Sequence, residues 1–348
     1  MNKHKQRELT MNKLTKIGAS ALCGSLAAIS AANAGDLSVT GGVDMSWVSF
    51  DNDTTGNPIG MGSNLTFTGS GELDNGWGVA LSVATANLDA YSNTNVTVTV
   101  PTLGDIRIDQ GTSGTGIDRM DDKTPNVWEE ADGTGLTTGI QKIAGGSAGS
   151  TIEYTPNMMP DGITAVIAYS PNAGGSNAGD KAGSGDGSGA TESSLEWTIE
   201  VDGGNVGVEG LTVYGGMATI KQDAANSSID DDAEEETLGA TYAAGNFTLG
   251  YQYSKDDLGR SASPQFYENT MYGITFQVND DLSIGYNNIE SEQDNGSSAN
   301  VTAEASAFEL AYTMGGASIR LAEASIDNKQ YQSGTNRDAT TLSVSLAF

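Results

Sequence analysis

The chain has 348 residues, and 45 Asp and Glu against 16 Lys and Arg give it a formal net charge of −29 at pH 7. This acidic balance argues against nucleic acid as a partner, because phosphates are bound by lysine and arginine. The single cysteine and the single histidine, Cys23 and His4, both fall within the first 34 residues. The rest of the chain lacks the side chains for disulfides, for Ser-His-Asp or Cys-His catalysis and for ordinary zinc sites, so we expect no enzyme.

The first predicted element, residues 1–34, is a secretory signal peptide. A basic start is followed by an apolar run of small residues that closes on the A-x-A pattern of Ala32 and Ala34. This order predicts cleavage after Ala34, and Met11 is favoured as the true start. The apolar run is too short and too weakly hydrophobic for a membrane anchor.

Residues 35–348 then form one predicted domain with strand periodicity. Taking the five basic residues and the one acidic residue of 1–34 from the totals leaves 11 basic and 44 acidic residues, a net charge of −33. Apolar and polar residues alternate in DLSVTGGVDMSW, residues 36–47, and again in 64–73 and 76–84. Alternation with a period of two predicts β-strands, and its regularity argues against disorder.

The alternation continues to the end of the chain and predicts sixteen strands, with no convincing amphipathic helix. After the first three stretches, the predicted strands lie near residues 93–100, 103–110, 149–156, 162–170, 193–202, 210–221, 236–244, 245–255, 267–279, 280–290, 301–314, 316–326 and 338–348. Tight links such as Gly315-Gly316 alternate with long polar links such as 111–148 and 171–192. Short turns on one side and long loops on the other are typical of an outer-membrane barrel.

We therefore predict an all-β fold, a sixteen-stranded antiparallel transmembrane β-barrel with short periplasmic turns and long extracellular loops. Every backbone polar group of such a barrel is paired between strands, which lets it cross a membrane without a helix. Sixteen strands enclose an aqueous space. The polar face of each strand is therefore expected to line the lumen, and the apolar face to contact lipid.

The chain closes on TTLSVSLAF, residues 340–348, a strand with one apolar face. The residues of that face are Leu342, Val344, Leu346 and Phe348. With this ending, the strand pattern, and LGDIRIDQG (residues 103–111) before a long loop, the whole mature chain resembles the Gram-negative general porins. In that family, a last strand closing on phenylalanine is recognised by the barrel assembly machinery. The last strand must also pair with the first to close the barrel.

The resemblance implies a homotrimer in the outer membrane, among outer-membrane lipid and lipopolysaccharide, with a third loop that folds inward to narrow each pore. The candidate constriction loop is the link 111–148, whose length is uncommon unless it is functional; a solvated surface loop is the alternative. Its candidate residues are Asp118, Arg119, Asp121, Asp122, Lys123, Glu129, Glu130 and Asp132. Family members set such acids against an arginine cluster on the wall, but here the first five strands offer only Arg107, so we expect a weak transverse field.

The polar face of each strand, which is formed by every second residue, also predicts the residues of the lumen wall. They are Asp44, Glu72, Arg107, Asp109, Glu153, Glu196, Glu200, Glu309 and Arg320. Because acids predominate on the wall and on the loop, the field concentrates cations. We expect an outer-membrane porin for passive diffusion of small hydrophilic solutes and ions, with a modest preference for cations. A solute-preferring channel and a non-transporting surface or adhesin barrel are the alternative hypotheses.

Two acidic stretches have weaker interpretations. DNDTTG, with Asp51 and Asp53, copies the first half of an EF-hand loop, but its twelfth position is Gly62 in place of glutamate. A solvated hairpin tip is favoured, a loop-bound calcium ion is the alternative, and no other metal or cofactor is expected. The acidic run 230–236 is interpreted as a repelling extracellular face, with divalent bridging to lipopolysaccharide as the minority interpretation.

The role assigned to the terminus gives a direct prediction. Deleting Phe348 removes the last seam residue and the expected assembly signal without changing synthesis of the chain. We expect unassembled, protease-sensitive protein in the periplasm in place of a heat-modifiable band in the outer membrane. Normal assembly of the truncated chain would contradict the assembly signal.

Overall fold

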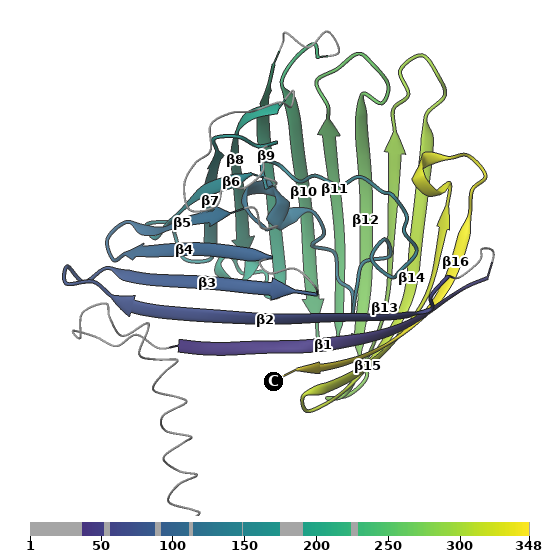
Figure 1. Ribbon diagram of the computed structural model, residues 1–348, viewed down its shortest axis with the longest axis horizontal. Coiled ribbons are helices and arrows are strands. Elements are labelled where there is room, and N and C mark those ends of the chain that lie inside the picture. Colours follow the sequence, from purple (N-terminus) through teal and green to yellow (C-terminus); the bar gives the residue numbers. More distant parts are fainter. Residues whose placement is uncertain are drawn as a thin grey trace, which may run out of the picture.

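The computed structural model is a closed barrel of sixteen antiparallel strands (Figure 1). It describes residues 37–347 except 52–55, 88–91, 111–113, 148, 175–190 and 224–228, so the predicted signal peptide with Ala32 and Ala34, and Phe348, lie outside the described residues. The strands are β1 Leu37–Phe50, β2 Ile59–Glu72, β3 Gly78–Ala86, β4 Asn93–Val100, β5 Gly104–Gln110, β6 Ser150–Pro156, β7 Ile163–Ser170, β8 Thr191–Asp202, β9 Leu211–Gln222, β10 Ala233–Ala244, β11 Phe247–Asp257, β12 Phe266–Gln277, β13 Leu282–Gln293, β14 Val301–Met314, β15 Ala317–Asp327 and β16 Arg337–Ala347. The predicted fold class is confirmed.

Each strand pairs with its neighbours in the sequence, and β16 closes the ring against β1. At this seam Met45 lies opposite Val344, and Trp47 lies opposite Leu342. The closure leaves no open edge along the seam, which in a two-ended sheet would be a template for aggregation. The last strand is therefore held in place by its pairing with β1.

Turn chemistry agrees with the predicted sorting of links. Two-residue turns join β10 to β11 and β14 to β15. Gly245 and Gly315, the first residues of these turns, have φ angles of 61° and 58°. A positive φ at this position is required by the hairpin turns that match strand twist, and glycine adopts it without steric cost. Most strand ends agree with the sequence to within three residues, but β2 begins at Ile59, five residues before the predicted start at 64, and β10 begins at Ala233 and not at residue 236.

The outward face of the barrel is apolar and exposed. Trp47 and Leu342 are neighbours across the seam and are 44% and 41% exposed, and Ile59 and Leu321 extend the same row. The inward positions between them, such as Ser343, are buried and polar. A continuous apolar band on the outside of a closed barrel is suited to contact with lipid.

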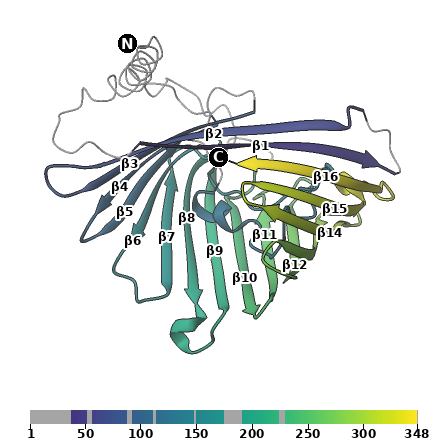
Figure 2. The ribbon, with the colours of Figure 1, turned by 90° about the horizontal axis from the view of Figure 1, so that it is seen from below.

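The link between β5 and β6, residues 111–149, is here called the inner loop. Its described residues lie inside the ring of strands, where the blue turn of helix is visible in Figure 2. That turn is η1 (Gly116–Met120), one of three short 3-10 helices among the described residues, and the other two are η2 (Gly203–Val206) and η3 (Lys329–Tyr331). Within the described part of the chain, no helix is both long enough and apolar enough to cross a membrane.

Candidate functional site

The inner loop follows the inner wall of the barrel over most of its circumference. η1 lies against β7–β10, and the next segment crosses the inward glycines of β11–β13. Residues 131–136 then reach β16 and β1. The returning segment, residues 139–146, passes β12 and β10 and reaches β8. The loop therefore narrows the lumen from the β7–β16 side.

Buried carboxylates on the wall hold the outgoing start of the loop. Glu153 of β6 accepts the backbone N–H of Gly116 at 2.8 Å. Glu196 of β8 accepts the N–H of Ile117 at 2.9 Å and that of Gly146 at 2.7 Å. The two glutamates are only 3% and 1% exposed. Backbone donors of an irregular loop need partners when they are buried, and a carboxylate oxygen is a strong acceptor for them.

Two further glutamates hold the middle and the end of the loop in the same way. Glu309 of β14 accepts the N–H groups of Val127 at 3.1 Å and Glu129 at 3.2 Å. Glu235 of β10 accepts those of Ala144 at 3.1 Å and Gly145 at 2.7 Å. Both glutamates are almost fully buried. Three of the predicted wall acids, Glu153, Glu196 and Glu309, therefore lie on the inner face but beneath the loop, where they accept hydrogen bonds from its backbone N–H groups.

Glu235 is an exception to the interpretation of the acidic run 230–236 as a repelling extracellular face. The run enters β10 at Ala233, so alternate residues point to opposite sides of the wall. Glu234 is exposed on the outside, whereas Glu235 is buried on the inside beside the loop. The alternation of residues along the strand could have placed Glu235 on the inner face. It did not, because the strand was predicted to begin at residue 236, after Glu235.

Inward glycines let the loop touch the backbone of the wall. A Cβ atom at Gly250 would come within 2.3 Å of Pro125 Cδ, and one at Gly273 within 2.1 Å of the Pro125 carbonyl oxygen. A Cβ at Gly285 would lie 3.2 Å from a methyl group of Val127. Side chains at these inward positions would push the loop into the lumen, so the glycines set how closely it packs.

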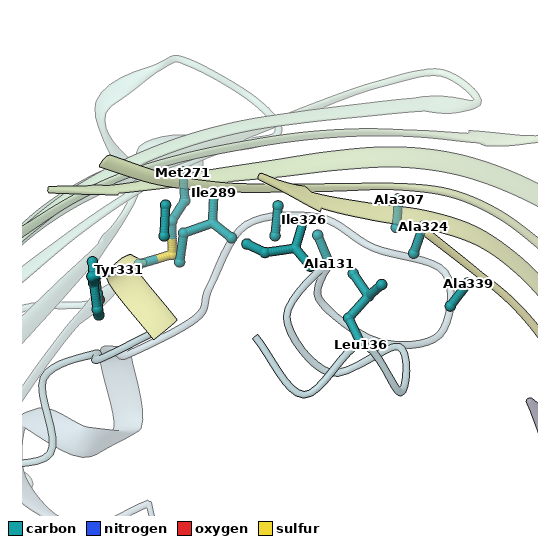
Figure 3. Close-up of a cluster of buried hydrophobic side chains, with 11 residues drawn as sticks. Ala131, Leu136, Met271, Ile289, Ala307, Ala324, Ile326, Tyr331 and Ala339 are labelled. Carbon is teal, nitrogen blue, oxygen red and sulfur yellow. The ribbon is translucent and has the colours of Figure 1, made fainter. Parts of the chain in front are cut away.

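An apolar cluster holds the far end of the loop against β12–β16 (Figure 3). Its buried residues are Ala131, Leu136, Met271, Ile289, Ala303, Ala305, Ala307, Ala324, Ile326, Tyr331 and Ala339. This differs from the expectation of a polar inner face, because the inward alanines of β14 give the loop a flat apolar surface. The Tyr331 hydroxyl also accepts the N–H of Gln141 at 2.9 Å, which joins the last extracellular loop to the inner loop.

Several basic side chains of the lumen are paired with carboxylates. Arg107 lies 2.5 Å from Asp109 and 3.4 Å from Glu153, and Arg119 also pairs with Glu153. Lys123 pairs with Glu200. Arg320 lies 2.9 Å from Asp44, which also accepts a hydrogen bond from Ser343 at 2.5 Å.

Lys142, which was not among the predicted site residues, lies within a group of aspartates on the inner loop. Its Nζ is 3.2 Å from Asp122, 3.4 Å from Asp132 and 3.7 Å from Asp121. The sequence offered Lys142 only as a loop lysine twenty residues after Asp122. The folding of the loop back on itself brings these charges together.

The opposite wall, β2–β4, presents mainly uncharged side chains to the lumen. Its inward positions include Thr66, Thr68, Ser82, Asn95 and Thr97. The predicted Glu72 shares this parity but lies exposed at the turn end of β2. Loop acids therefore face hydroxyl and amide groups across the lumen, and the wall cations nearest to the loop, such as Arg320, already have partners.

Burial changes the protonation of the loop acids. It raises the pKa of Asp121 to about 8, and the neighbouring Asp122 adds to the rise. It also raises the pKa of Glu130 to about 7, again with a contribution from Asp122. The pKa values of Asp118 and Glu129 are raised by burial too. The charge of the loop is consequently sensitive to pH near neutrality.

The calcium hypothesis concerns the first hairpin tip. Asp51 is described and follows β1, but Asp53 lies outside the described residues. Over the ranges that the structure does describe, no three ligating side chains gather in a way that could hold a metal ion. A calcium ion at this tip therefore stays a prediction.

Replacing Glu196 tests the anchoring of the loop. Glu196→Ala leaves the N–H groups of Ile117 and Gly146 without their acceptor, at a cost of about 1–3 kcal/mol for each buried donor. We expect the folded barrel in detergent to become cleavable by trypsin after Arg119 and Lys123. Glu196→Gln keeps one acceptor oxygen and should be less sensitive, and Glu290→Gln on the outer face should match the parent. Equal resistance of all four proteins would show that Glu196 does not hold the loop.

Comparison with known proteins places this architecture in a family. The family model described as Gram-negative porin matches residues 18–348. No curated protein sequence matches the chain. Among solved structures, OmpF of Salmonella typhi in complex with daunomycin is similar at 13% identity and a TM-score of 0.67, over 90% of this chain and 98% of that one.

Two other solved porins have the same fold. The anion-selective porin from Comamonas acidovorans is similar at 14% identity with a TM-score of 0.61, over 90% of this chain and all of that one. OmpT of Vibrio cholerae is similar at 15% identity with a TM-score of 0.59, over 92% of this chain and all of that one. At these identities the likeness concerns the fold, while the family match covers nearly the whole sequence. The chain therefore belongs to the Gram-negative porin family and is an outer-membrane porin.

Proposed function

We propose that this porin forms a water-filled channel for passive diffusion of small hydrophilic solutes and ions, with a modest preference for cations. The observation that supports the preference is a lumen narrowed by an acidic loop opposite an uncharged wall. The basic residues Arg107, Arg119, Lys123 and Arg320 are paired with carboxylates, which leaves little of their positive charge to attract anions. A low-dielectric wall strengthens the field of the remaining acids inside the channel.

Three considerations keep the proposed preference modest. Glu153, Glu196, Glu235 and Glu309 are buried under the loop and bind its backbone, so they contribute less to ion choice than their number suggests. Ten further acids belong to the extracellular links 51–58, 87–92, 171–190, 223–232 and 294–300, and not to the wall or the inner loop. Salt shortens the screening length from about 10 Å at 0.1 M to about 3 Å at 1 M, so the preference should fade as KCl rises.

The alternative functions differ in what they require of the lumen. A solute-preferring channel needs a fixed set of groups that binds one class of solute, and the hydroxyl and amide groups of β2–β4 are the candidates for it. A non-transporting surface or adhesin barrel would need a closed lumen and would show no conductance. Conductance of the purified protein in a planar bilayer distinguishes the non-transporting barrel from both kinds of channel.

We also propose a homotrimer in which the side of the barrel formed by β1–β7 packs against further copies. Strands β3–β7 have only 7–9 residues, and the outward positions of β1–β7 carry no charged residue over their described lengths. On β12–β15, by contrast, Glu268, Glu290, Glu304 and Glu323 point outward, which suits contact with the polar region of lipid and lipopolysaccharide. The mass of the native oligomer decides this proposal.

We also propose that the chain is exported by a cleaved signal peptide and assembled into the outer membrane through its last strand. The signal peptide of residues 1–34 and recognition of the C-terminal strand by the barrel assembly machinery are consistent with a protein of the outer membrane. Leu342 and Leu346 are exposed on the outer face of β16, with Val344 between them, as such a terminal strand requires.

Neutralising the loop tests the cation preference. In a variant with Asp121 and Asp122 replaced by Asn, and Glu129 and Glu130 by Gln, the loop loses up to four negative charges. The reversal potential in a KCl gradient should shift toward anions, because these acids provide most of the exposed charge at the constriction. An unchanged reversal potential would mean that the loop does not line the pore, and anion preference in the parent protein would contradict the charge argument.

The raised pKa values of the loop acids predict how the cation preference changes with pH. Asp121 and Glu130, with pKa values of about 8 and about 7, are ionised above these values and protonated below them. The cation preference should therefore be larger at about pH 9 and fall as the pH drops to about 6. The fourfold loop variant is the control, and its reversal potential should stay nearly constant over the same range. A parent protein with no pH dependence in this window would contradict the assignment.

A further inference from the structure

Lys142 is the one basic side chain described here that touches three acids of the inner loop at once. The aspartates Asp121, Asp122 and Asp132 come from the outgoing limb of the loop, and Lys142 comes from the returning limb. Its ammonium therefore joins the two limbs across the face that narrows the lumen. The side chain is 18% exposed, so the charge is shielded from bulk solvent but still close to the water of the channel.

The backbone beside Lys142 is fixed on both sides. The N–H of Gln141 donates to the Tyr331 hydroxyl at 2.9 Å, and the N–H of Ala144 donates to Glu235 at 3.1 Å. The position of the Lys142 backbone is therefore fixed, and its ammonium stays tethered within reach of the aspartates. Its ammonium acts as a fixed positive charge within a negative group, unlike a mobile counter-ion.

An ammonium carries the same charge as a monovalent cation such as K⁺. At 3.2–3.7 Å from the carboxyl groups of three aspartates, it occupies a place that would otherwise attract a permeating cation. Conduction requires that an ion be attracted strongly enough to enter and weakly enough to leave. A tethered cation among the carboxylates would keep that balance by leaving only part of their charge open to the lumen.

We propose that Lys142 is the selectivity-determining residue of this constriction, a tethered counter-ion that limits how strongly the channel prefers and retains cations. This inference rests on the proposed function as a diffusion channel. It assigns the weakness of the cation preference to one residue in the lumen and not to screening alone. Removing the ammonium should raise both the cation preference and the affinity for cations.

The size of the effect follows from Coulomb attraction. One unit charge several ångströms from the path of the ion, in water and with partial screening, changes the ratio of cation to anion permeability by about twofold. Lys142→Gln should therefore raise the K⁺/Cl⁻ permeability ratio by about that factor. Its conductance should also saturate at a lower KCl concentration than that of the parent, because cations remain longer among the unpaired aspartates.

A cysteine variant separates charge from folding, because both signs of charge can be tested on one folded protein. The chain from residue 35 onward contains no cysteine, so Lys142→Cys provides a unique thiol. Its thiolate attacks a methanethiosulfonate reagent, forms a mixed disulfide and releases methanesulfinate. A trimethylammonium-ethyl reagent should return the reversal potential toward that of the parent, and a sulfonato-ethyl reagent should move it further toward cations.

Two controls define what would overturn the inference. Lys142→Arg keeps the charge and should behave as the parent does. Lys221→Gln removes the same charge from the outer face of β9, where Lys221 pairs with Asp232, and should leave the permeability ratio unchanged. If the parent conducts but the two reagents shift the reversal potential equally, Lys142 has no electrostatic role. A parent without conductance would overturn the proposed channel itself and this inference with it.

Discussion

The interaction on which the rest of the lumen depends is the acceptance of loop backbone N–H groups by buried wall carboxylates. The inner loop has little secondary structure to satisfy its own donors, and burial removes water as a partner. Glu196, Glu235 and Glu309 each bind two of these donors, and Glu153 binds one and also pairs with arginines. Spaced along the wall, these glutamates hold an irregular segment in one path.

This anchoring divides the acids of the lumen into two groups. One group is buried, bonded to backbone and fixed in place, and its charge is partly balanced by the N–H dipoles that it accepts. The other group lies on the loop, partly exposed, beside Lys142 and the water of the channel. The field that a passing ion meets comes mainly from the second group. A formal count of acids therefore overstates the electrostatic selectivity of this barrel.

Packing decides on which side of the lumen the charge lies. Inward glycines on β11–β13 and inward alanines on β14 and β15 let the loop lie flat on that part of the wall. The wall of β2–β4 keeps hydroxyl and amide side chains and receives no comparable apolar surface. The resulting lumen is acidic on one side and neutral on the other. This arrangement is the basis of the proposed cation preference, and it lacks the strong transverse field of opposed acids and arginines.

The sequence by itself determined the sixteen strands, their inward and outward faces, and the closing strand, because a period of two is a local property that each strand carries independently. The same alternation also correctly predicted that Glu153, Glu196 and Glu309 lie on the inner face. It could not show that the loop covers them, that Glu235 joins them, or that Lys142 meets three aspartates. Those contacts join residues 10 to 182 positions apart, and only the path of the loop over the closed wall brings them together.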